Sequence, residues 1–206
     1  TVFEPTEYGQ LSLFYLVSSF FLILSLGPYG SYLLANCQRW DREGNLLDNL
    51  TALILVAIGC GFVLTVIAVS LGFSHSAPAT YYSYIGLFLV GSGVAQTMIS
   101  ASAIVITIRF AVYIAVLYAL GCLLSSLLFV YFFGNEVTNW IQGQILFQTL
   151  FSVSLYARFF TTSDFKFPKG TTKFFLRSSY NFASTTAIVS ALSWFLYQAP
   201  KVIYSR

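Results

Sequence analysis

The amino-acid sequence predicts an all-α membrane protein, a polytopic helical bundle of about six transmembrane helices whose N-terminus lies on the outer side. Of its 206 residues, 57% are hydrophobic and 8% are charged, whereas a soluble domain carries about 25% charged residues. Between Asp48 and Glu136, Arg109 is the only Asp, Glu, Lys or Arg. The net charge of +3 is too small to indicate a nucleic-acid partner. We therefore expect an integral membrane protein, because such a chain cannot cover itself with a hydrated surface.

Residues 81–133 form an apolar stretch that is too long for one transmembrane helix. At about 1.5 Å of rise per residue they would extend roughly 80 Å, against a hydrocarbon core of about 30 Å. The simplest arrangement is two spans that fold back at or near Arg109. The same length rule divides the rest of the chain. We expect one transmembrane domain over residues 1–206, with spans at 11–34, 50–73, 82–105, 110–133, 138–160 and 178–197.

The charges in the connections predict the orientation. The loops after the first, third and fifth spans carry the cations Arg39, Arg42, Arg109, Arg158, Lys166, Lys169, Lys173 and Arg177. The other connections carry Glu4, Glu7 and Glu136, although Lys201 and Arg206 also fall on that side. Because cationic loops stay on the inner side, the N-terminus is expected outside. The basic segment with Lys166, Lys169, Lys173 and Arg177 is expected to contact anionic lipids or a partner protein.

Arg109 has two interpretations. As a turn residue, it would extend its guanidinium to the head groups at the inner interface. As an arginine inside the membrane, it would face a path for protons or ions. Residues 104–108 contain no residue type that favours a turn, so a tight reversal there is unfavourable. The second interpretation of Arg109 therefore stays open.

Glutamines inside two spans are the other candidate polar positions. Gln144, Gln148 and Ser152 recur at intervals of four and share one helical face. Amides are costly in lipid unless they find partners, so this face must point into the bundle or toward another subunit. Gln96 on the third span is a candidate partner across the helices. Interhelical hydrogen bonding is the default interpretation, and a polar pore or substrate-binding wall is the alternative.

The third span also carries small residues at intervals of four, which let helix backbones approach closely. Gly91 with Ala95, and Gly93 with Thr97 and Ala101, form such rows. We therefore expect this span to be a central packing helix.

Residues for catalysis or metal binding are sparse. The chain has one histidine, one methionine and three cysteines without metal-ligand spacing. No Asp, Glu or Lys lies centrally in an expected span, and no nucleophile stands with a base. We therefore expect that the protein is not an enzyme and that it holds neither a metal ion nor a cofactor.

The sequence therefore favours a non-catalytic accessory or scaffold subunit of a larger membrane complex, for example a bioenergetic one. Its expected partners are membrane lipids and other membrane protein subunits, in an energy-transducing inner membrane or the plasma membrane. A transporter or channel for a small solute, lined by Gln96, Gln144 and Gln148, is the alternative. A cofactor-binding or receptor-like helical bundle ranks third.

Overall fold

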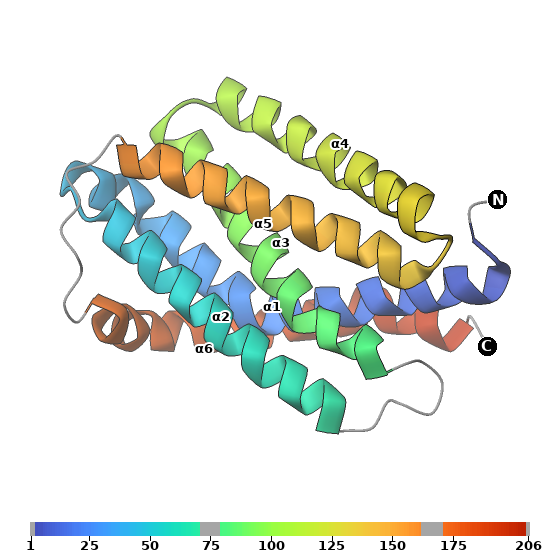
Figure 1. Ribbon diagram of the computed structural model, residues 1–206. Coiled ribbons are helices and arrows are strands. Elements are labelled where there is room, and N and C mark those ends of the chain that lie inside the picture. The colour runs from blue at the N-terminus through green and yellow to red at the C-terminus, as the bar shows by residue number, and fades with distance from the viewer. Residues whose placement is uncertain (1–2, 71–78, 162–170, 205–206) are drawn as a thin grey trace.

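The computed structural model describes residues 3–70, 79–161 and 171–204, and every secondary-structure element within these ranges is a helix, joined where described by short turns. Figure 1 shows the six helices: α1 (Pro5–Arg42), α2 (Leu46–Ser70), α3 (Ala79–Val105), α4 (Ile108–Phe133), α5 (Val137–Thr161) and α6 (Thr171–Tyr204). The expected all-α class is confirmed. Wherever the structure describes them, the residues of each expected span fall within one of these helices.

In the part of the chain that the structure describes, four helices are long and apolar enough to cross a membrane. They are α1, residues Leu46–Ile67 of α2, residues Tyr84–Val105 of α3, and the whole of α4. A helix of about 20 apolar residues matches the thickness of the hydrocarbon core. These four helices identify the chain as a membrane protein.

Two tight connections show how local chemistry ends and starts the helices. The α3–α4 reversal contains only residues 106 and 107, and the Thr107 hydroxyl accepts a hydrogen bond from the Phe110 amide at 3.2 Å. Threonine is a good N-cap, so the expectation that residues 104–108 lack a turn-forming residue is wrong. At the other end of α4, Gly134 adopts a φ of 112°, which an L side chain rarely tolerates.

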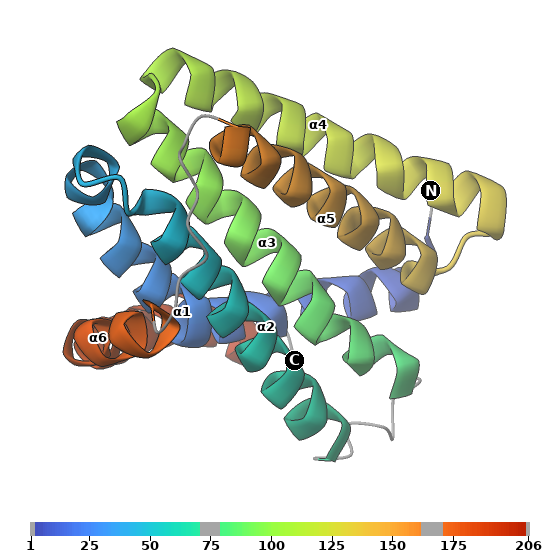
Figure 2. The same cartoon turned by 60° about the vertical axis from the view of Figure 1, so that its left-hand side comes forward.

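Helix α3 lies at the centre of the bundle. It packs against α1, α2, α4 and α5, while α4 and α6 lie on opposite sides of the molecule. Figure 2 shows α4 and α5 paired over α3, with α6 beyond α1 and α2. Helix α6 packs against α1 and α2 and is held by Phe175, which is fully buried beside Tyr32 and Trp40.

Small residues allow the central helices to approach closely. A Cβ at Gly93 would lie 2.7 Å from a Leu26 methyl carbon of α1. A Cβ at Gly61 of α2 would lie 2.9 Å from the Gly86 carbonyl oxygen of α3. At both positions a larger residue would push two helices apart, which explains why α3 is rich in glycine and alanine.

The two ends of the bundle differ in charge. The end formed by the α1–α2 and α3–α4 connections, the last turn of α5 and the first turns of α6 carries the described cations Arg39, Arg42, Arg109, Arg158, Lys173 and Arg177, together with Asp41, Glu43 and Asp48. The opposite end, where α1 begins, α4 turns into α5 and α6 ends, carries Glu4, Glu7 and Glu136, with Lys201 in the last turn of α6. The charge asymmetry of the sequence is therefore a spatial asymmetry of the fold.

Candidate functional site

A cavity of about 350 Å³ lies between α1, α3, α4 and α5 and brings the three predicted glutamines together. Its walls come from Tyr15, Ser18, Ser19 and Leu22 of α1, Phe88, Ser92 and Gln96 of α3, Tyr118 and Cys122 of α4, and Gln144 and Gln148 of α5. We call it the glutamine cavity. It contains amides, hydroxyls, a thiol and aromatic rings, and none of its lining residues is Asp, Glu, Lys, Arg or His.

Two polar groups of the glutamine cavity are buried without a partner. The Ser18 hydroxyl and the Gln148 side-chain carbonyl oxygen make no hydrogen bond to any residue that the structure describes. Their side chains are only 1% and 3% exposed. Leaving such a group unsatisfied costs about 1–3 kcal/mol. Two costs of this kind on residues that line one cavity make it the strongest candidate for a ligand-binding or water-binding site.

A hydrogen-bond chain fixes one wall of the glutamine cavity. The Tyr15 hydroxyl donates to the Gln144 side-chain oxygen at 2.7 Å, and the Trp140 indole N–H donates to the same hydroxyl at 3.0 Å. This chain ties α1 to α5, two helices that otherwise share few contacts. Tyr118 of α4 and Gln148 of α5 both line the cavity, close enough for an electrostatic interaction between their side chains.

The glutamines do not pair with one another in the way the sequence indicated. Gln144 bonds Tyr15 of α1, and the Gln148 oxygen is left without a partner. Gln96 lines the cavity, is exposed, and makes no hydrogen bond to another described residue. The cross-helix partner of the stripe on α5 is therefore a tyrosine of α1, which sequence periodicity on α5 alone does not reveal.

The cationic candidates lie away from the glutamine cavity. Arg109 is exposed in the first turn of α4, about 14 Å along the helix from the level of Tyr118. Lys173 and Arg177 are exposed in the first turns of α6. Lys166 and Lys169 lie outside the described residues. None of the described cations belongs to the cavity wall.

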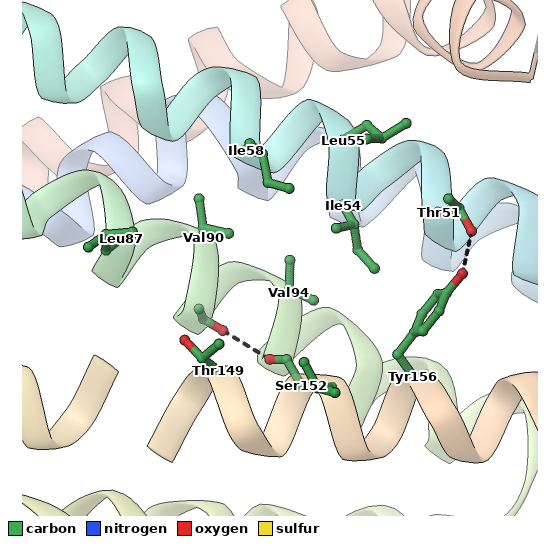
Figure 3. A pocket seen from close by; sticks show the side chains of 12 residues that line it. Thr51, Ile54, Leu55, Ile58, Leu87, Val90, Val94, Thr149, Ser152 and Tyr156 are labelled. Carbon is green, nitrogen blue, oxygen red and sulfur yellow. Dashed lines mark hydrogen bonds between the residues drawn. The ribbon is translucent and has the colours of Figure 1, made fainter. Parts of the chain in front are cut away.

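A second cavity of about 500 Å³ lies between α2, α3 and α5, on the other side of the α3–α5 contact. Figure 3 shows its mostly aliphatic wall, with the Thr51–Tyr156 hydrogen bond of 2.8 Å at one end. The hydroxyl of Ser152 reaches the Gly91 carbonyl at 3.5 Å. Thr149 also lines this cavity, and its hydroxyl donates to the Ile145 carbonyl at 2.8 Å. Because its polar side chains are already hydrogen-bonded, this cavity offers mainly apolar contact to a ligand.

Helix α6 carries a set of exposed polar residues on one face. We call Arg177, Asn181, Ser184 and Thr185 the polar stripe, because their spacing of four and three residues places them on one side of the helix. The hydroxyls of Ser184 and Thr185 both donate to the Asn181 carbonyl, at 3.1 and 3.0 Å. The Asn181 side-chain amide makes no hydrogen bond within the described part of the chain.

Sequence reasoning missed the contributions of α1 and α4 to the site. Tyr15, Ser18 and Tyr118 become important only when their helices are brought against the glutamines of α5. A weak signal was present, since each is a polar side chain within an apolar run, but many such residues bond their own helix instead. Ser92 does so, donating to the Phe88 carbonyl at 2.7 Å.

Within the described residues, no three His, Cys, Asp or Glu side chains gather where they could hold a metal ion. The fold and the site define a class, which is a helical membrane protein with an uncharged cavity lined by four of its helices. In comparisons with known proteins, no family model, curated protein or solved structure matches the chain.

Proposed function

We propose that this protein is a non-catalytic accessory subunit of a larger membrane assembly, with six spans and its N-terminus on the outer side. The observation that carries the proposal is the polar stripe of α6. The cationic end of the bundle, which would face the inner side, supports the orientation. An energy-transducing inner membrane and the plasma membrane remain the two proposed locations.

The polar stripe is poorly suited to lipid. Lys173 is exposed near the start of α6, and Asn181 follows about 12 Å further along the helix. In the proposed six-span arrangement, this depth brings Asn181 into the hydrocarbon core. An amide exposed to lipid tails has no partner for its hydrogen bonds, and such groups turn toward other helices. The opposite surface of the bundle has a different character, because the exposed face of α4 is built from Val112, Val116, Leu120, Leu123 and Leu127. We infer that lipid covers α4 and that a helix of a partner protein covers the polar stripe.

Site-specific photocrosslinking in native membranes tests the subunit role. A benzoylphenylalanine at Thr185, within the polar stripe, is expected to give a discrete protein adduct of defined mass. The same probe at Val116 of α4, which is 54% exposed, is the matched control and is expected to label lipid. The proposal fails if the Thr185 probe labels only lipid and the chain is isolated from its membrane as a monomer.

A transporter or channel for a small neutral solute is the second candidate, and the glutamine cavity favours it. The cavity gathers amides from α3 and α5 near the middle of the bundle without a charge in its wall. Reconstitution into liposomes tests this role directly. The purified chain is expected to pass a neutral solute, and Gln96→Leu with Gln144→Leu is expected to reduce the flux. A solute flux that is absent, or unchanged in the double variant, excludes this candidate.

A further inference from the structure

We propose that the glutamine cavity binds an uncharged, hydroxyl-bearing ring compound that enters sideways from the lipid bilayer. This inference goes beyond the proposed subunit role and does not depend on it. It rests on the unpartnered polar atoms of Ser18 and Gln148, the uncharged wall and the position of the cavity in the bundle.

The wall selects for a neutral ligand. None of the lining residues is Asp, Glu, Lys, Arg or His, so an ionic ligand would leave its hydration shell without gaining a counter-charge. Phe88, Tyr15 and Tyr118 line the cavity from three helices and offer ring faces and edges for aromatic packing. The volume of about 350 Å³ falls within the range of about 300–1,000 Å³ that is typical of small-molecule sites.

The unpartnered atoms select for a hydrogen-bond donor. The side-chain oxygen of Gln148 can only accept a hydrogen bond, and it is buried without one. The hydroxyl of Ser18 can accept or donate, and it is also unpartnered. A ligand hydroxyl that donates to Gln148 removes the cost of a buried acceptor. A ring with two hydroxyls satisfies Ser18 as well, and Ser18 and Gln148 come from different helices, α1 and α5.

The position of the cavity indicates entry from the membrane. Ser92 lies at the middle of α3, and Tyr118 and Cys122 lie near the middle of α4, so the cavity is near the mid-height of both apolar helices. Helices α1 and α4 both line it but do not pack extensively against each other, and we infer that the ligand enters between them. Gln96 of α3, which also lines the cavity, is exposed. A ligand with a ring in the cavity can therefore leave an alkyl tail in the lipid.

Equilibrium dialysis with a radiolabelled probe tests the proposal on the protein isolated from its own membrane in mild detergent. The probe is decylhydroquinone, kept reduced, and its matched control is the dimethyl ether, which has the same ring and tail but no donor. We expect saturable binding of decylhydroquinone and binding of the ether that is at least about tenfold weaker, the factor for one well-placed hydrogen bond. Cholesterol and its methyl ether form a second arm that distinguishes an aliphatic ring from an aromatic one.

Two pairs of variants locate the ligand. Gln148→Met is expected to weaken binding about tenfold, whereas Gln142→Met is expected to leave it unchanged. Gln142 lies on the same helix but donates to the Tyr84 hydroxyl at 2.6 Å and does not line the cavity. Ser18→Ala is expected to weaken binding about threefold or more, and Ser25→Ala is its control. Ser25 donates to the Phe21 carbonyl at 2.6 Å, also outside the cavity.

Three outcomes overturn the proposal. The first is that neither ring compound binds, in which case water fills the glutamine cavity. The second is that each ether binds as well as its parent alcohol. The third is that the Gln148→Met and Ser18→Ala variants both bind the probe as tightly as the unaltered protein does. If Gln148→Met does not fold, Ser18→Ala decides the question, because removing an unpartnered buried hydroxyl is not expected to destabilise the fold. Partner capture and solute flux play no part in this measurement, so its failure is separate from theirs.

Discussion

Replacing Gly143 by alanine tests the packing of α4 against α5. A Cβ at this position would lie 2.6 Å from the Ser125 carbonyl oxygen and 2.8 Å from the Ser126 Cα, whereas ordinary contacts begin at 3.4 Å. Both neighbours are backbone atoms, so the helices must separate by about 0.8 Å, the difference between 3.4 and 2.6 Å. The Ser125 hydroxyl, which donates to the Gly143 carbonyl at 2.7 Å, would be displaced as well.

The change in the free energy of unfolding follows from three effects, of which the first stabilises the variant and the other two destabilise it. Alanine gains about 0.5–1 kcal/mol of helix propensity over glycine. Overpacking costs about 1–3 kcal/mol, and an interhelical hydrogen bond in a membrane contributes about 0.6 kcal/mol. We expect Gly143→Ala to lower the free energy of unfolding by about 1–3 kcal/mol.

The assay is reversible unfolding in mixed micelles with increasing dodecyl sulfate, followed by circular dichroism and tryptophan fluorescence. Gly59→Ala on α2 is the matched control, because a Cβ there meets no atom within 4 Å. This variant is expected to be as stable as the unaltered protein or more stable, by up to about 1 kcal/mol. If Gly143→Ala unfolds at the same detergent fraction as Gly59→Ala, the close α4–α5 contact does not exist and the reasoning is refuted.

Three further predictions follow from single contacts. Thr107→Ala removes the N-cap of α4 and should lower stability by about 0.5–1 kcal/mol, while Thr107→Ser should restore it; both are measured in the same unfolding assay. Tyr15→Phe removes the hydroxyl that bonds both Gln144 and Trp140, so the free energy of unfolding should fall by about 1–2 kcal/mol. The fluorescence emission of Trp140 should also change, and an unchanged emission spectrum would contradict its hydrogen bond to Tyr15. Ser18→Ala removes an unpartnered buried hydroxyl, so ligand-free protein should gain about 1 kcal/mol, and a loss of that size would show that the hydroxyl has a partner in the empty cavity.

The helices could be predicted because the length of each apolar run can be read directly from consecutive residues of the sequence. Each long apolar run must satisfy its backbone hydrogen bonds without water, and a helix does this within its own segment. The clearest local error concerned the α3–α4 reversal, where isoleucines and valine surround Thr107 and obscure its capping role. A cap depends on one side chain and one amide, so it is easily missed in a search for glycine, proline and asparagine.

The glutamine cavity was only half predictable. Periodicity places Gln144 and Gln148 on one face of α5 and requires that face to be shielded from lipid. It does not say which helix shields it or which atoms remain unpaired. Those facts depend on how α1 crosses α5, and this crossing brings Tyr15 to Gln144 and Ser18 to the same cavity.

The amino-acid sequence by itself determined that the chain is helical and belongs in a membrane. The length of each apolar run and the scarcity of charged residues are properties of consecutive residues and do not depend on the fold. The sequence also determined the charge difference between alternate connections. Only the tertiary structure decided that α3 is central, that α4 presents an apolar face, and that the polar stripe of α6 lies exposed. The physical reason is that the burial of a side chain depends on which other helix packs against its own. The same polar side chain is costly in lipid, satisfied against a neighbour, or available to a ligand, according to which helix the fold places beside it.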